Sequence, residues 1–380
     1  MRIAIDAHSV GAKLAGNESY AVNLIEALAQ IDRLNAYTLY VTTSEAYERF
    51  HQRWPNFKVH TTLPHTPLIR IPLTLSAELR KHPVDVLHVQ FTAPPLCPCP
   101  VVVSLHDLSF EHLPQTFNRR SRTQLRLTVR HSARRAAQIL TLSEHTRRDV
   151  IDTYAIAPHK VTAIPLAAPA HFCPVNDDME LQRVRHTYGI NGDYVLSVGS
   201  IQPRKNLVRL IKAYASLRDR HTGSRFPQLV LVGKCAWLYD ETLRALDETK
   251  LRDSVVLTGY VPEAHLPALY SGALCFVYPS YFEGFGLPPL EAMKCGTPVI
   301  VGNATSLPEV VGDAGLKVDP FDVSAIAGAI EELINNSELR KELTVKGSKR
   351  AEMFDWRNTA QQTLKVYEQV ARESYRSAAS

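Results

Sequence analysis

Residues 279–293 read PSYFEGFGLPPLEAM and directly follow the apolar run 273–278, which has the pattern of a buried strand. The two glycines in this stretch permit the tight backbone geometry that a close approach to a ligand requires. The proline pair suits the first turn of a helix, where a missing N–H costs nothing. The stretch therefore predicts a strand, a glycine-rich loop, and a helix whose free N–H groups can bind an anion.

Two glutamates frame this loop, with Glu283 inside it and Glu291 on the predicted helix. A carboxylate is a poor partner for phosphate, but it accepts hydrogen bonds well from a sugar diol. An anion site between two diol acceptors matches the groups of a nucleotide sugar. A plain strand-to-helix connection with two surface glutamates is the alternative interpretation, and the glycines and prolines between the glutamates disfavour it.

A second motif lies upstream of this loop. A buried strand pattern over 194–198 leads to Gly199, and a short turn then brings Arg204 and Lys205 to the start of a helical segment. Arginine offers a planar fork of donors and lysine a compact point charge, so together they can bind a diphosphate. A solvated pair of surface cations is the alternative.

Two strand-to-helix connections in the N-terminal half carry further candidate contacts. The strand pattern at 3–6 precedes a loop with Gly16, which can let backbone N–H groups approach a phosphate; a plain turn explains this glycine equally well. The strand pattern Val101–Leu105 ends at His106, where open α/β sheets bind ligands. A purely structural histidine is the alternative at this position.

The chain resembles the retaining glycosyltransferases of family 4 in the spacing of Glu283 and Glu291 and in the Gly-Phe-Gly-Leu-Pro between them. The N-terminal loop is similar to that of the family, but Leu14-Ala15 replace its adjacent glycines. The family implies an α/β fold of the GT-B type, with two Rossmann-like doubly wound domains facing across a cleft. Alternating strand and helix patterns and a proline-rich stretch near residue 170 agree with two domains. We expect an acceptor-binding domain at 1–170, a nucleotide-sugar-binding domain at 171–356, and a final helix at 357–380 that packs back on the first.

The resemblance also implies roles for individual residues. Glu283 and His106 would contact the donor sugar, Glu291 the ribose, and Arg204 with Lys205 the diphosphate. We expect all of these except Glu291 to act in catalysis. The other donor-binding residues implied are Gly16, Gly199, Gly259, Tyr260, Val261, Gly284, Phe285, Gly286 and Leu287. The departing phosphate oxygen would itself accept the proton of the acceptor, so no separate base is assigned.

The activity implied is a retaining transfer of a hexose from a nucleotide diphosphate sugar to a saccharide or lipid-linked acceptor in cell-surface polysaccharide synthesis. No Asp-x-Asp occurs in the sequence and the six cysteines show no paired Cys-x-x-Cys pattern, so we expect no metal, no cofactor and free thiols. Residues 233–239 resemble members that use GDP-mannose, and UDP-glucose and UDP-N-acetylglucosamine are the alternatives. A nucleotide-sugar 2-epimerase and a non-catalytic nucleotide-sugar-binding subunit are rival hypotheses. Gly-x-Gly-x-x-Gly is absent after the first strand pattern, which argues against a nicotinamide enzyme.

The net charge of +5 is unevenly distributed, because seven arginines crowd Arg119–Arg135 and no acidic residue lies between His112 and Ser143. Such a cluster predicts contact with an anionic membrane. A solvated helix face is the alternative, and no motif indicates nucleic acid as a partner. The apolar, proline-broken segment 65–75 predicts an acceptor-side or membrane-facing loop, and a plain surface loop is the alternative. No apolar run approaches the roughly 20 residues of a membrane-spanning helix, and the N-terminus shows no signal peptide. We therefore expect a cytoplasmic protein, peripheral at the inner face of the membrane.

Overall fold

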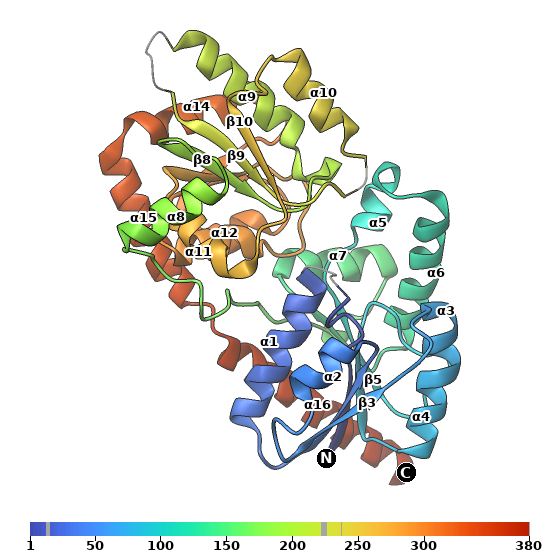
Figure 1. Ribbon diagram of the computed structural model, residues 1–380. Coiled ribbons are helices and arrows are strands. Elements are labelled where there is room, and N and C mark those ends of the chain that lie inside the picture. The colour runs from blue at the N-terminus through green and yellow to red at the C-terminus, as the bar shows by residue number, and fades with distance from the viewer. Residues whose placement is uncertain (13–15, 222–225, 237, 380) are drawn as a thin grey trace. The chain divides into compact units, whose positions relative to one another are not determined.

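The computed structural model describes residues 1–12, 16–221, 226–236 and 238–379. The chain divides into two compact units (Figure 1). Unit 1 comprises Met1–Leu166 and Asp355–Ser380, and unit 2 comprises Ala167–Phe354.

Unit 1 contains a seven-stranded sheet with the order β3-β2-β1-β4-β5-β6-β7, in which every neighbouring pair is parallel. Its strands are β1 (Arg2–Asp6), β2 (Ala36–Val41), β3 (Phe57–Thr61), β4 (Val86–Gln90), β5 (Val101–Leu105), β6 (Gln138–Thr141) and β7 (Val161–Ala163). The strand order changes direction between β1 and β4, which is the point where doubly wound sheets bind ligands. The carboxyl ends of β1, β4 and β5 therefore lie side by side.

Helices cover both faces of this sheet, so its central strands are buried along their length, as in other parallel sheets. The helical segments are α1 (Gly16–Ile31), α2 (Ser44–Phe50), α3 (Pro67–Ile69), a π-helix η1 (Arg70–Leu75), α4 (Ser76–Lys81), α5 (Ser109–His112), η2 (Pro114–Thr116), α6 (Arg119–Arg135), α7 (Glu144–Tyr154), η3 (Pro158–Lys160) and α16 (Trp356–Ala379). The last of these, α16, packs against α1 and β4 within unit 1. It is fixed there by Tyr367, whose hydroxyl lies 2.5 Å from Nδ1 of His88 on β4.

Within the segment 65–75, residues 67–75 are helical, so the prediction of a loop there is wrong. Pro67 begins α3, and the π-helix η1 continues into α4. The physical reason is Arg70, which is 1% exposed and donates from Nη1 to both carboxylate oxygens of Asp6 at 2.9 Å. Burial of this ion pair draws the segment onto the unit, while the side chains of Leu68 and Leu73 remain exposed.

Unit 2 contains a six-stranded parallel sheet with the order β10-β9-β8-β11-β12-β13. Its strands are β8 (Tyr194–Val198), β9 (Gln228–Val232), β10 (Val255–Gly259), β11 (Cys275–Tyr278), β12 (Val299–Gly302) and β13 (Gly315–Val318). Its helical segments are α8 (Asp178–Thr187), η4 (Pro203–Lys205), α9 (Leu207–Arg220), α10 (Asp240–Glu248), η5 (Glu263–His265), α11 (Leu266–Ser271), α12 (Leu287–Lys294), α13 (Leu307–Val311), α14 (Val323–Asn335) and α15 (Ser337–Glu352). Apolar side chains of α9 and α14, such as Ile211 and Ile330, form a core with the sheet. Here the order changes direction between β8 and β11, which brings the two predicted motifs onto neighbouring strands.

Among the described residues, no helix is both long enough and apolar enough to cross a membrane.

Candidate active site

At the carboxyl edge of the unit 2 sheet, a glycine lies at or directly after the end of three adjacent strands. Gly199 follows β8, Gly233 follows β9, and Gly259 ends β10, with φ angles of 151°, 145° and 67°. A Cβ on Gly233 would lie 2.1 Å from the carbonyl oxygen of Gly199, so only glycine fits between these strand ends. This edge consequently presents backbone rather than side chains, which allows a ligand to approach it closely.

Next to this edge, Glu283 is held between two cations. Its Oε2 lies 2.7 Å from Nη1 of Arg204, and its Oε1 lies 2.6 Å from Nζ of Lys205. The Ser280 hydroxyl donates to Oε1 at 2.7 Å. Burial by itself would raise the pKa of Glu283, but the charges of Arg204 and Lys205 outweigh it and lower that pKa to about 2. The carboxylate is therefore ionised at neutral pH.

Two residues that follow β12 hold the loop that carries Glu283. The backbone N–H of Glu283 donates to Oγ1 of Thr305 at 2.9 Å, and the Ser306 hydroxyl donates to the carbonyl oxygens of Glu283 and Phe285 at 2.9 and 2.7 Å. The Tyr278 hydroxyl at the end of β11 accepts a hydrogen bond from Lys205. These supporting residues were not predicted. Their common signal is a position at or just after the carboxyl end of a strand.

The other side chains of the predicted loop have a mainly structural role. Phe285 is buried and meets Phe354 edge-to-face at 5.8 Å, so its side chain is not available to a ligand. Gly284 is buried too, and Leu287 begins α12. Gly286 has a φ of 120°, and a Cβ there would lie 2.8 Å from a methyl of Leu307.

Glu291 lies on α12 in a different environment from Glu283. The Tyr270 hydroxyl donates to its Oε2 at 3.0 Å. Burial raises the pKa of Glu291 to about 7, and the hydrogen bond from Tyr270 only partly opposes this shift. The two predicted glutamates thus differ in charge near neutral pH, because two cations oppose burial at Glu283, whereas burial dominates at Glu291.

The predicted donor-binding residues Tyr260 and Val261 directly follow β10. Val261 is buried, whereas Tyr260 is 65% exposed, with Nζ of Lys234 at 4.5 Å from the centre of its ring. Lys234 follows the adjacent strand β9, and it was not predicted as a site residue.

In unit 1, His106 directly follows β5 and is 7% exposed. Its Nδ1 lies 2.8 Å from Oδ1 of Asn17, a residue that was not predicted. Burial lowers the pKa of His106 to about 4, so the ring is neutral at pH 7. Gly16 is the first residue of α1, and a Cβ there would meet no atom within 4 Å among the described residues. Leu14 and Ala15, where the family has glycines, lie outside the described residues.

Within the described ranges, no group of three or more His, Cys, Asp or Glu residues is arranged to hold a metal ion. The six cysteines are free thiols.

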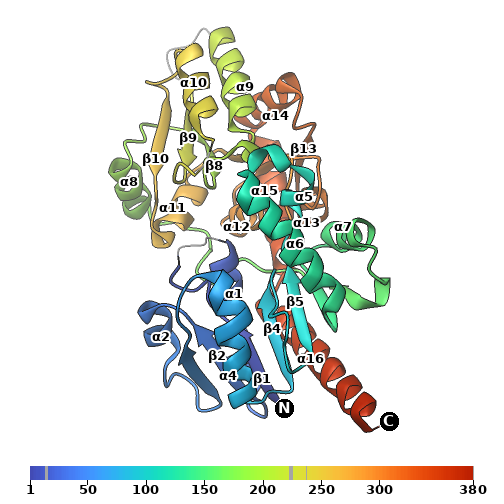
Figure 2. The same cartoon turned by 90° about the vertical axis from the view of Figure 1, so that its right-hand side faces the viewer.

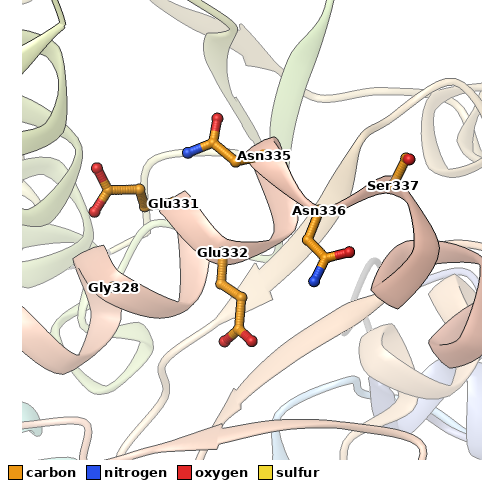
Figure 3. A pocket seen from close by; sticks show the side chains of 6 residues that line it. All are labelled: Gly328, Glu331, Glu332, Asn335, Asn336 and Ser337. Carbon is orange, nitrogen blue, oxygen red and sulfur yellow. The ribbon is translucent and has the colours of Figure 1, made fainter.

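A surface hollow elsewhere in unit 2 does not coincide with any predicted site residue. It is lined by Gly328, Glu331, Glu332, Asn335, Asn336 and Ser337, at the end of α14 and the start of α15. The labelled side chains point away from one another in Figure 3 rather than converging on one point. Two of them are acidic, which disfavours a nucleoside diphosphate as a ligand.

Comparison with known proteins places these features in a family. Glycosyltransferase Family 4 matches residues 15–169 and Glycosyl transferases group 1 matches residues 179–350. The O-antigen chain mannosyltransferase B of Escherichia coli is 37% identical over 268 residues, which is 70% of this chain and 69% of that protein. The chain belongs to glycosyltransferase family 4.

Two further comparisons bear on the size and fold of this transferase. The serotype-specific mannosyltransferase WbdA of Escherichia coli is 32% identical over 63% of this chain, but the match covers only 30% of WbdA. The structure of sucrose-phosphate synthase from Thermosynechococcus elongatus superimposes with a TM-score of 0.77 at 20% identity, over 97% of this chain and 98% of that one. The predicted fold, with two parallel Rossmann-like sheets of the GT-B type, is confirmed, and so is the prediction of a glycosyltransferase.

Proposed function

We propose that this transferase moves mannose from GDP-mannose to a saccharide or lipid-linked acceptor, with retention of the anomeric configuration and without a metal. The observation that carries the proposal is the Glu283–Arg204–Lys205 cluster beside the glycine-ended strands of unit 2. Two cations with one carboxylate leave one positive charge, which a diphosphate can use. The backbone-lined edge next to them suits the extended body of a nucleotide.

The reaction that fits this cluster is departure of a nucleoside diphosphate from the sugar. As the bond from the anomeric carbon to the phosphate oxygen breaks, negative charge grows on the diphosphate and positive charge on the sugar ring. Arg204 and Lys205 stabilise the negative charge on the diphosphate, because fixed donors in a water-poor site stabilise most strongly where charge develops. The ionised Glu283 accepts hydrogen bonds from the sugar and stabilises the positive charge on its ring. In this proposal the leaving phosphate oxygen accepts the proton of the acceptor hydroxyl.

The choice of mannose and guanine rests on the names of two relatives and on one stretch of sequence. Two relatives are named mannosyltransferases, and residues 233–239 resemble members that use GDP-mannose. The name of one relative also refers to O-antigen chains, which favours a cell-surface polysaccharide as the product. UDP-glucose and UDP-N-acetylglucosamine remain the alternative donors.

A transfer assay tests the proposal directly. The full chain is incubated in excess EDTA with GDP-mannose, UDP-glucose or UDP-N-acetylglucosamine and a lipid-linked saccharide acceptor, and the product linkage is read by NMR. We expect turnover with GDP-mannose alone and an α-linked product. A metal requirement, a β-linked product or turnover with a UDP-sugar would each contradict one part of the proposal. Release of an epimer without acceptor indicates the epimerase, and GDP binding without turnover indicates a binding subunit.

We also propose that unit 1 docks on an anionic membrane through α6. Six of the seven arginines of α6 are exposed: Arg119, Arg120, Arg126, Arg130, Arg134 and Arg135. Leu127 lies among them and is 68% exposed. Leu68 and Leu73 are also exposed, and they belong to the segment that leads into α4. In Figure 1, α3 and α4 lie below α6 along one side of unit 1. In Figure 2, α4 and α6 face the viewer. Exposed basic side chains together with exposed apolar side chains are the combination that binds acidic lipid.

Liposome co-sedimentation tests this docking. The double variant Arg130→Glu/Arg134→Glu should lose binding to vesicles containing acidic lipid, and wild-type binding should fade as salt rises, because exposed charges are screened beyond about 10 Å at 0.1 M salt. The matched control is Arg218→Glu/Arg244→Glu, which changes the net charge equally at exposed sites of unit 2. Equal loss in both double variants, or equal binding to neutral vesicles, would exclude α6 as the docking surface.

A further inference from the structure

The imidazole of His106 has one satisfied nitrogen and one unsatisfied nitrogen. Nδ1 lies 2.8 Å from Oδ1 of Asn17. Nε2 is buried, and none of the described residues forms a hydrogen bond with it. A buried polar atom without a partner is uncommon in native proteins and calls for a physical reason.

The ring cannot turn to exchange its two nitrogens without disturbing its neighbours. Tyr20 contacts it edge-on with ring centres 4.7 Å apart, and Phe91 does so at 5.2 Å. Asn17 and Tyr20 stand three positions apart on α1 and therefore project from the same face of the helix. The first turn of α1 thus fixes both the orientation of the ring and the partner of Nδ1.

Asn17 is itself held by buried groups. Its backbone carbonyl accepts a hydrogen bond from the hydroxyl of Ser9 at 3.1 Å, and Ser9 is fully buried. The same hydroxyl accepts from Nε2 of Gln90, at the end of β4, at 3.1 Å. The start of α1 is therefore tied to the carboxyl edge of the sheet on which His106 lies.

The hydrogen bond between His106 and Asn17 determines which nitrogen of the imidazole carries the proton. A neutral imidazole carries one N–H donor and one acceptor nitrogen, and a carbonyl oxygen such as Oδ1 can only accept. With Nδ1–H donating to Asn17, Nε2 keeps its lone pair. A bare lone pair repels a phosphate oxygen but accepts a hydrogen bond from a hydroxyl group.

We propose that Asn17 is a positioning residue that holds His106 as the Nδ1–H tautomer, so that Nε2 accepts a hydrogen bond from a hydroxyl group of the sugar substrate. This inference rests on the proposed function, because the hydroxyl belongs to a transferred or accepting sugar. An asparagine achieves this without adding a charge, whereas an aspartate in its place would favour the imidazolium form. The charged and titratable groups facing His106 are Asp107, His88 and Tyr20.

The tautomer can be measured without any substrate. The full chain is labelled with ring-15N histidine, and the His106 signals are assigned by comparison with His106→Gln. At pH 7 we expect a protonated Nδ1 and an unprotonated Nε2 in wild type, and a mixture of tautomers in Asn17→Ala. A protonated Nε2 in wild type, or an unchanged tautomer in Asn17→Ala, overturns the proposal.

Kinetic measurements provide a second test of the role of Asn17. Asn17→Ala should lower kcat/KM for GDP-mannose by about tenfold, whereas Asn23→Ala, on the same helix but bonded to the Ser19 carbonyl, should not. Asn17→Asp keeps the acceptor and should retain activity at pH 8. Its carboxylate raises the pKa of His106, so its activity should fall at a higher pH than that of wild type as the solution is acidified. Equal activity of Asn17→Ala and Asn23→Ala contradicts the proposal. If wild type transfers no sugar, the proposed function fails while the 15N spectra still decide the tautomer.

Discussion

In unit 2, Glu283 is buried between Arg204 and Lys205; in unit 1, His106 is buried between an amide and two aromatic rings. Both side chains stand just after a strand at the carboxyl edge of a parallel sheet, and burial acts on both. The outcome differs because of the neighbours: two cations keep Glu283 charged, whereas Asp107 beside His106 does not outweigh burial and the imidazole is neutral. The carboxyl edge of the same kind of sheet therefore holds a charged side chain in one unit and a neutral one in the other.

Removing charge from the unit 2 cluster should have the largest effect. Lys205→Met should lower kcat by about 10²–10³-fold, because it removes a donor aimed at charge that develops during the reaction. Glu283→Gln should lower kcat by a similar factor. The two changes should act in opposite directions on the affinity for GDP. Lys205→Met removes a positive charge and weakens GDP binding. Glu283→Gln removes the negative charge that partly neutralises Arg204 and Lys205, so it should tighten GDP binding by about tenfold.

Calorimetric titration of GDP separates these effects from turnover. Lys212→Met on α9 and Glu332→Gln on α14 are matched controls with exposed side chains. Weaker GDP binding by Glu283→Gln would show that Glu283 orders the cations rather than competing with the diphosphate for them.

Glu291 should show an intermediate effect that depends on pH. Its pKa is raised from 4.5 to about 7, so the folded state binds more protons than the unfolded state between these values, and stability falls as pH rises through this window. Glu291→Gln should therefore raise Tm relative to wild type at pH 8 more than at pH 5. The same variant should bind GDP about tenfold more weakly at pH 8, because an ionised carboxylate is the better acceptor for the ribose hydroxyls.

Thermal unfolding at the two pH values and calorimetry with GDP check this pair of expectations. Glu309→Gln on α13 is the control. A Tm difference that is the same at pH 5 and pH 8 would mean that Glu291 is not protonated in the folded protein.

The smallest effect is expected at the uncharged network of unit 1. Tyr367→Phe removes the hydroxyl that meets His88, which should cost about 1 kcal/mol in the free energy of unfolding. Because burial lowers the pKa of His88 to about 3, this loss should be constant from pH 6 to pH 8, unlike that at Glu291. Urea unfolding measures it, with Tyr375→Phe at the exposed end of α16 as the control. A loss that grows as pH falls from 8 to 6 would show that His88 titrates there.

The sequence predicted the fold and the charged residues of the candidate site because both depend on local patterns. A strand that ends at glycine, followed by a turn with two cations, is visible around Gly199 without any knowledge of the sheet. The pairing of Arg204 and Lys205 with Glu283 was not predicted, because it depends on β8 lying next to β11 across some 80 residues of chain. From the residues alone, the two cations were expected at the phosphates and the glutamate at the sugar, as separate contacts.

The residues that were missed have ordinary local explanations. An asparagine at the start of a helix such as Asn17 looks like a capping residue, and its contact with His106 spans 89 positions. Ser306 looks like a turn residue until its hydroxyl is seen to hold the Glu283 loop. The helical segment after His65 was mistaken for a loop because its conformation follows from burial of Arg70 against Asp6, and neither periodicity nor capping reports that contact.

The return of α16 to unit 1 means that this unit is built from both ends of the chain, whereas unit 2 is a single continuous segment. During synthesis, Ala167–Phe354 is translated after α1 and β4 and before the helix that covers them. Domains generally fold as units once their sequence is available. The fold of unit 1 can therefore be completed only after α16 has been made, when Tyr367 can reach His88. A lesion near residue 360 acts on the N-terminal half of the protein, because α16 packs there against α1 and β4.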